Sequence, residues 1–139
     1  MRTEQHLRLK ELELPPVLAV SLGGAAGAVA RYGVAELVDR SHSDAFPWDT
    51  LAVNLIGSFL LGLLLALLGS SAHRSSARLL FGTGMLGAFT TFSTFSLDTA
   101  NLLRNDAALT SIIYVTTSLA GGLALAWAGI GVARRLRNR

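Results

Sequence analysis

The sequence contains no cysteine, and this absence removes several classes of chemistry at once. Disulfide bridges, cysteine-ligated zinc sites and thiol catalysis are all excluded. Histidine is scarce as well, and the three histidines (His6, His42 and His73) all lie outside the apolar runs. A buried catalytic or metal site based on histidine is therefore not expected, and we expect no enzyme activity.

Charged residues are few, at 15% of 139 residues, whereas soluble domains carry about a quarter. Hydrophobic residues make up 51% of the chain, and the mean hydropathy is +0.48. The net charge of +3 would suit a nucleic-acid binder, but the basic residues cluster beside apolar segments, as they do at membrane flanks. We therefore expect a protein embedded in membrane lipid, with no nucleic-acid partner.

Four apolar segments follow one another, each close to the ~20 residues that cross a bilayer. They run from about residue 17 to 38, 50 to 69, 79 to 103 and 111 to 132. The sequence thus predicts an all-α membrane protein with four transmembrane helices in residues 15–133. Residues 1–14 are expected to form an amphipathic cytoplasmic segment, and residues 134–139 a basic C-terminal tail.

The distribution of arginine and lysine predicts which side of the membrane each loop occupies. Four spans place both termini on one side, and that side carries nine basic residues against two or three on the other. Cytoplasmic loops are enriched in lysine and arginine. We therefore expect a multi-pass protein of the plasma or inner membrane, with both termini in the cytoplasm.

The third segment contains "GAFTTFSTFS" at residues 87–96, which has five hydroxyl residues and three phenylalanines but no ionisable group. Its β-branched and hydroxyl residues are poor helix formers, and they fall at the expected bilayer midplane. An interruption of the third helix is predicted there. Carbonyls freed by such a break are tolerated only inside protein or around an ion, and they can hold sodium.

Polar residues of the second and fourth segments also line up on helix faces. Asn54, Gly57 and Ser58 share one face, and Tyr114 and Ser118 share another. Uncharged donors suit an anion that must shed water and still leave, and phenyl edges are weakly positive. The alternative is local: each hydroxyl bonds to a carbonyl of its own helix, and the rings pack in the core.

The same motif, together with "GGAAGAVARYG" (23–33) and "TLAVNLIGSFLLGLL" (50–64), resembles the Fluc-type, or CrcB-like, fluoride channel family. The resemblance extends from residue 18 to 131. It implies a passive and selective channel that exports fluoride. It also implies an antiparallel dimer of four-helix subunits with two pores.

Residue roles follow from the matched motifs. The resemblance implies that Arg31 marks where the anion enters, although this side chain could instead extend to the lipid headgroups. The carbonyls of Gly87 and Thr90 would hold a structural sodium ion at the dimer interface. A further position of the family's polar track falls on Gly122, which has no hydroxyl. The expected pore-lining residues are Asn54, Phe92, Phe95, Tyr114, Ser118, Thr91 and Thr94.

Two questions stay open at the level of sequence. An antiparallel homodimer should have balanced loop charge, so the basic bias also fits a heterodimer with an oppositely oriented homologue. The alternative function is a proton-coupled exporter of the small multidrug type, which needs a membrane carboxylate such as Asp98 or Glu36. An intramembrane hydrolase is disfavoured because no span contains histidine or lysine. A purely structural assembly factor is also disfavoured, because it would not need the hydroxyl and amide groups that share these helix faces.

Overall fold

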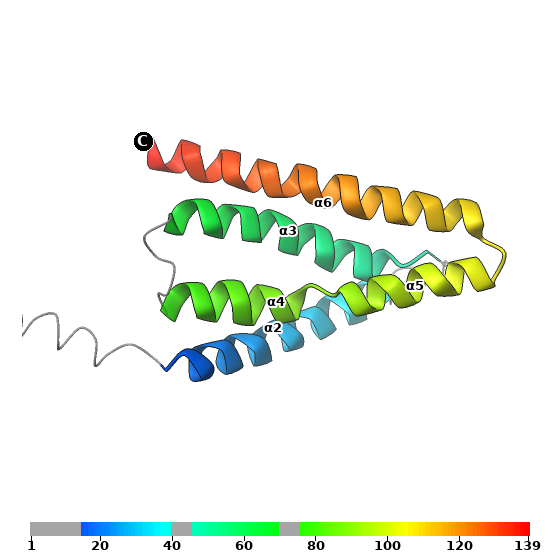
Figure 1. Ribbon diagram of the computed structural model, residues 1–139, viewed down its shortest axis with the longest axis horizontal. Coiled ribbons are helices and arrows are strands. Elements are labelled where there is room, and N and C mark those ends of the chain that lie inside the picture. Colours follow the sequence, from blue (N-terminus) through cyan, green and yellow to red (C-terminus); the bar gives the residue numbers. More distant parts are fainter. Residues whose placement is uncertain (1–14, 40–45, 70–75) are drawn as a thin grey trace, which may run out of the picture.

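The computed structural model describes residues 15–39, 46–69 and 76–139, and within these ranges the regular structure is entirely helical. This confirms the predicted all-α class, while the predicted segment 1–14 lies outside the described residues. Because η2, α4 and α5 follow one another along one line, the described residues form four rods (Figure 1). The elements are α2 (Pro16–Asp39), α3 (Trp48–Leu68), the π-helix η2 (Arg78–Leu86), α4 (Gly87–Phe89), α5 (Phe92–Arg104) and α6 (Ala108–Arg137).

Three of the rods are single helices long and apolar enough to cross a membrane, at Pro16–Val38, Trp48–Leu68 and Ala108–Arg137. The third predicted span is instead divided among η2, α4 and α5, which have 9, 3 and 13 residues. None of these three pieces alone reaches the ~20 residues of a membrane-spanning helix. The division falls inside "GAFTTFSTFS".

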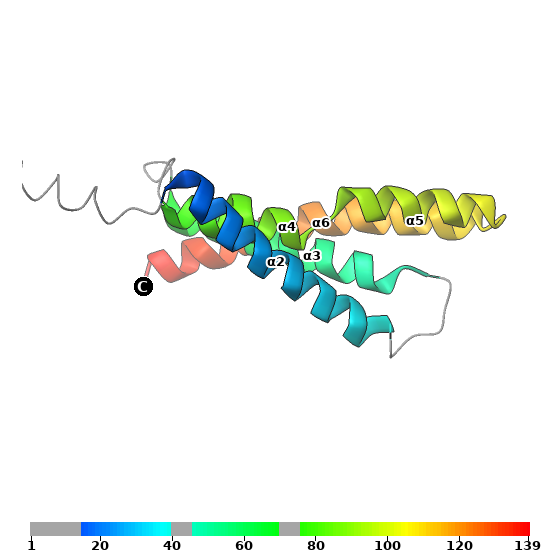
Figure 2. The same ribbon diagram turned by 90° about the horizontal axis from the view of Figure 1, so that it is seen from below.

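The beginning of α2, the end of α3, the beginning of η2 and the C-terminus lie at the same end of the bundle (Figures 1 and 2). Figure 2 also shows that α2 crosses the layer formed by the other rods. Arg78 begins η2, and Arg134 and Arg135 lie in the last turns of α6, so these arginines belong to one end. The helix α6 continues through Arg137, whose Nη1 donates to the Ala66 carbonyl at 3.3 Å.

The helices α3 and α6 pack along most of their length, and glycine allows their backbones to touch. A methyl group on Gly62 would overlap the Ala126 carbonyl oxygen, and one on Gly129 would overlap the Phe59 carbonyl oxygen. Small residues at such contacts are typical of membrane helix pairs. This contact fixes the relative position of α3 and α6, which carry Asn54 and Ser118.

The π-helix is a departure from the α-helix expected at residues 79–86. The Gly87 N–H donates to the Gly82 carbonyl, five residues earlier. Glycine again permits a close neighbour, because a methyl group on Gly84 would lie 2.7 Å from the Val20 carbonyl oxygen of α2. Short π segments often accompany functional sites in helices, and this one leads directly into the divided region.

Few side chains are fully buried in the single chain. A core cluster of Leu51, Leu102 and Tyr114 packs with partly buried neighbours that include Phe46 and Phe95. Many large apolar side chains lie on the outside instead, as with 79% exposure for Val17 and 73% for Trp127. Such a surface suits contact with lipid tails or with another subunit.

Candidate functional site

The chain leaves helical geometry at two threonines between α4 and α5. Thr90 has φ −76° and ψ 157°, and Thr91 has φ −145° and ψ 119°. Thr91 then caps α5, because its Oγ1 accepts a hydrogen bond from the Thr94 N–H at 3.1 Å. Threonine is a favoured N-cap residue, so the sequence itself specifies the start of α5.

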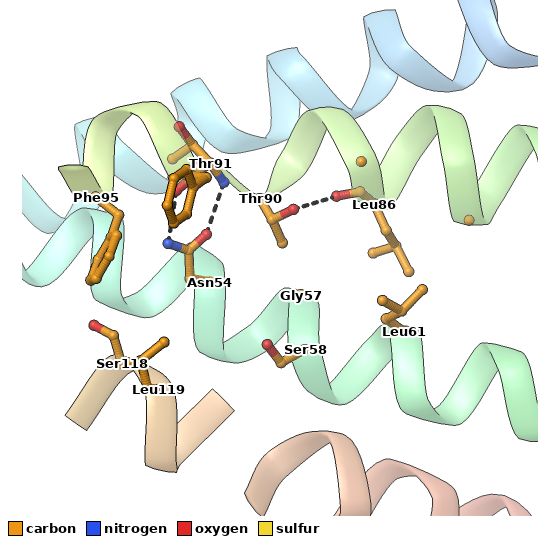
Figure 3. Close-up of a pocket in the computed structure, with 13 residues that line it drawn as sticks. Asn54, Gly57, Ser58, Leu61, Leu86, Thr90, Thr91, Phe95, Ser118 and Leu119 are labelled. Atoms are coloured by element: carbon orange, nitrogen blue, oxygen red, sulfur yellow. Dashed lines mark hydrogen bonds between the residues drawn. The ribbon is translucent and has the colours of Figure 1, made fainter. Parts of the chain in front are cut away.

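Asn54 of α3 pairs with the backbone at this break (Figure 3). Its Oδ1 accepts from the Thr91 N–H at 2.8 Å, and its Nδ2 donates to the Thr91 carbonyl at 3.0 Å. The side-chain amide thus satisfies both backbone polar groups of Thr91, which the helix does not satisfy. The nitrogen of an asparagine amide carries two hydrogens, and this pairing uses one of them.

Gly57 makes room for the break one turn after Asn54. A methyl group on Gly57 would overlap Cγ2 of Thr90. With glycine in place, Thr90 fits against α3 and its hydroxyl donates to the Leu86 carbonyl at 3.0 Å. Thr90 can therefore occupy this position only because residue 57 has no side chain.

The break also changes the partners of two backbone carbonyls. In a continuous helix, the Gly87 carbonyl would accept from the Thr91 N–H, but that amide donates to Asn54. The Thr90 carbonyl would accept from the Thr94 N–H, but that amide donates to the Thr91 hydroxyl. Both carbonyls have thus lost the donor that α-helical geometry would supply, and Gly87 is exposed. Oxygen ligands of this kind suit a hard cation.

A cavity of about 340 Å³ lies beside the break, between α3, the divided rod and α6 (Figure 3). Its lining contains amide, hydroxyl and phenyl groups, and none of the described residues that form it has an ionisable side chain. Five of the six predicted pore-lining or sodium-binding residues of the divided rod contribute to it, all except Thr94. The lining residues are Asn54, Gly57, Ser58, Leu61, Gly82, Leu86, Gly87, Thr90, Thr91, Phe92, Phe95, Ser118 and Leu119.

Ser118 brings α6 to this cavity. Its Oγ is buried and has no hydrogen-bond partner among the described residues. A buried hydroxyl without a partner costs free energy, so a ligand that accepts a hydrogen bond would be stabilised here. The two phenylalanines lie near one another, with ring centroids 5.8 Å apart, and Phe92 is 79% exposed.

Tyr114 lies deeper than the other predicted residues and outside the lining of this cavity. It is fully buried, and its ring packs against Phe95 at 5.3 Å and edge-on to Phe46 at 5.6 Å. Its hydroxyl donates to Oδ2 of Asp98 at 3.4 Å. Asp98, the carboxylate considered above for a proton-coupled exporter, is thus bonded to a tyrosine, and the ring of Tyr114 packs against that of Phe95.

Arg31 and Thr94 line a second cavity of about 320 Å³ between α2, α3 and the start of α5. Asp49 and Thr50 also contribute to its lining. Thr91 belongs to both cavities, and its hydroxyl lies 2.9 Å from that of Thr94. The buried Thr91 therefore lies between a cavity lined by both a guanidinium and a carboxylate group and one whose described lining residues include no ionisable side chain.

Sequence reasoning did not assign site roles to several residues that line the first cavity. Gly57 and Ser58 could have been found, because they share a helix face with Asn54 and are small or polar within an apolar run. Leu61, Leu86 and Leu119 carry no such signal, since leucine is the commonest residue of any membrane helix. Only the packing of the rods reveals them.

Comparison with known proteins places the chain in a family. Residues 18–130 match the profile described as CrcB-like protein, Camphor Resistance (CrcB). The chain is 49% identical over 119 residues to the "Fluoride-specific ion channel FluC" of Chlorobaculum tepidum, covering 85% of this chain and 94% of that protein. For the proteins of the same name from Agrobacterium fabrum and Thermus thermophilus, identity is 44% over 121 residues and 46% over 112 residues. Those alignments cover 86% and 81% of this chain, and 97% and 90% of the relatives. The chain is thus a multi-pass membrane protein and a member of the CrcB family.

Proposed function

We propose that this chain forms a passive, selective fluoride channel that exports fluoride from the cytoplasm and relieves its toxicity. Relatives that align over nearly their whole length are named fluoride-specific ion channels. The observation that carries the proposal is the lining of the first cavity, which offers amide, hydroxyl and phenyl groups without an ionisable side chain. Such a lining can replace the water of a small anion and still release it.

The donors would act in succession on the dehydrated ion. The second hydrogen of the Asn54 amide and the hydroxyl of Ser118, which has no partner among the described residues, are two donors that could bind the ion. Phe92 and Phe95 would present their positive ring edges. The helix α5 begins at Phe92, and the positive end of its dipole would add further positive potential at the cavity.

Residues of the second cavity would bring fluoride to this point. Arg31 supplies a fixed positive charge that lowers the cost of an anion in low dielectric. The hydroxyls of Thr94 and Thr91 would take the ion onward, because Thr91 lines both cavities. Tyr114 would hold the ring of Phe95 in place by packing against it. Its hydroxyl could donate to fluoride only after its hydrogen bond to Asp98 is broken.

We further propose that two subunits assemble antiparallel, with the break near the membrane midplane and one pore along each subunit. The carbonyls of Gly87 and Thr90 fit a sodium ion because both have lost their helical donors and both residues line the first cavity. Two carbonyls do not complete a cation shell, so the same pair from a second subunit would contribute. The sodium ion would supply positive charge and hold the two breaks together.

The identity of the second subunit is the finer part of this proposal. A second copy of the chain is the partner we propose first. The alternative is an oppositely oriented homologue, and the basic end formed by Arg78 with Arg134 and Arg135 favours it. Reconstitution of the purified chain alone distinguishes the two, because only a homodimer would be active.

Fluoride efflux from liposomes that contain the purified chain tests the function. We expect rapid efflux that needs no pH gradient, with chloride retained. Chloride efflux at a similar rate would contradict selectivity. A proton-coupled exporter would instead lose all transport when Asp98 and Glu36 are both neutralised, whereas a channel would still pass fluoride.

A further inference from the structure

Ser58 of α3 lies directly against a glycine of α6. A side-chain carbon built on Gly122 would lie 3.3 Å from Oγ of Ser58 and 4.0 Å from its Cβ. Gly122 follows Ser118 by four residues, so both belong to the same face of α6. The position that should continue the polar face beyond Ser118 therefore has no side chain, and the hydroxyl of Ser58 comes from the facing helix to the same place.

The other hydroxyls of the first cavity have partners. Thr90 donates to the Leu86 carbonyl at 3.0 Å. Thr91 Oγ1 accepts from the Thr94 N–H and lies within 3.2 Å of the Ser93 hydroxyl. Ser58 and Ser118 line the same cavity, and among the described residues neither hydroxyl has a hydrogen-bond partner. Figure 3 shows both side chains on the side of the cavity away from the break.

We propose that Ser58 is the hydroxyl donor that receives the anion after Ser118. The path would thus pass from Ser118 on α6 to Ser58 on α3, with Gly122 leaving the space between them. This inference rests on the proposed fluoride channel function and adds a specific donor to it. A hydroxyl can donate one hydrogen bond to a dehydrated anion, so its loss should slow the ion without blocking the cavity.

Fluoride efflux from liposomes tests this role with three variants and a control. We expect Ser58→Ala to slow efflux roughly ten- to hundredfold, as for the loss of one hydrogen bond to a charged group. Ser58→Thr keeps a hydroxyl at the same place and should retain efflux. Ser58→Ala combined with Gly122→Ser removes the crowding atom and moves the hydroxyl to α6, so efflux should recover. Thr116→Ala is the matched control, because this exposed residue lies on the opposite face of α6.

The results separate this inference from the proposed function. If the unaltered chain passes no fluoride, the proposed function fails with it. If the unaltered chain conducts and Ser58→Ala conducts within twofold of it, the role of Ser58 is overturned. It is also overturned if Ser58→Ala is slow and neither hydroxyl-bearing variant recovers efflux. Size-exclusion profiles of all variants should be unchanged.

Discussion

Replacement of Asn54 by aspartate separates the two tasks that this side chain performs. Aspartate keeps an acceptor for the Thr91 N–H, now at 2.8 Å from Oδ1, but it has no donor for the Thr91 carbonyl at 3.0 Å. One buried carbonyl without a partner costs about 1–3 kcal/mol. We therefore expect a moderate loss of thermal stability in detergent, with the break largely preserved.

We expect Asn54→Asp to reduce the rate of fluoride efflux far more than it reduces thermal stability. A carboxylate about 4 Å from the ion repels it by about 4 kcal/mol at an effective dielectric constant of about 20. This barrier corresponds to efflux slowed about a thousandfold. The measurement is the initial rate of fluoride release from liposomes, recorded with a fluoride electrode beside a thermal unfolding curve.

The matched control is the same exchange at Asn101, an exposed residue of α5. We expect Asn101→Asp to change efflux less than about threefold, because surface charge is screened. If Asn54→Asp conducts within tenfold of the unaltered protein, this amide does not lie on the anion path. If both the rate and the stability collapse together, the pairing with Thr91 would explain the whole effect and the donor role would be unsupported.

Three further predictions concern the break and its surroundings. Gly57→Ala brings a methyl group onto Thr90, so it should destabilise the fold by about 1–3 kcal/mol, whereas Gly24→Ala, which meets nothing within 4 Å, should not lower the midpoint of thermal unfolding. Phe92→Ile removes an exposed ring edge, so fluoride efflux should fall at least about tenfold while the size-exclusion profile stays unchanged; normal efflux would exclude this ring from the path. Replacing sodium by a large organic cation should remove the ion proposed at Gly87 and lower stability by about 2.7 kcal/mol if sodium had been present at about 100 times its Kd; an unchanged midpoint counts against the sodium site.

The positions of the long helices could be predicted because hydropathy is a local property. The expected spans 17–38 and 50–69 correspond to α2 at Pro16–Asp39 and α3 at Trp48–Leu68. The expected span 111–132 was shorter than α6, which runs from Ala108 to Arg137. Hydropathy reports the apolar part of a helix, whereas the hydrogen bonds that define it continue into the polar ends.

The sequence also predicted where the third helix is interrupted, but it did not predict which side chain pairs with the backbone at the interruption. A cluster of threonines and serines predicts a poor helix, and the chain leaves helical geometry at Thr90 and Thr91. The hydrogen bonds between Asn54 and the backbone of Thr91 join residues 37 positions apart, and no local sequence pattern predicts such a contact. The bond from Tyr114 of α6 to Asp98 of α5 likewise joins two rods.

In the channel that we propose, a single divided helix would serve both a cation and an anion, because the break redistributes backbone donors and acceptors. The N–H groups of Thr91 and Thr94 turn to the side-chain oxygens of Asn54 and Thr91. The carbonyls of Gly87 and Thr90 are thereby released as oxygen ligands, while the Asn54 amide retains a hydrogen to donate. Since neither change needs an ionised side chain, the proposed site would have a sodium ion nearby and would still release a small anion. A charged residue in the place of Asn54 would bind one ion too strongly and repel the other.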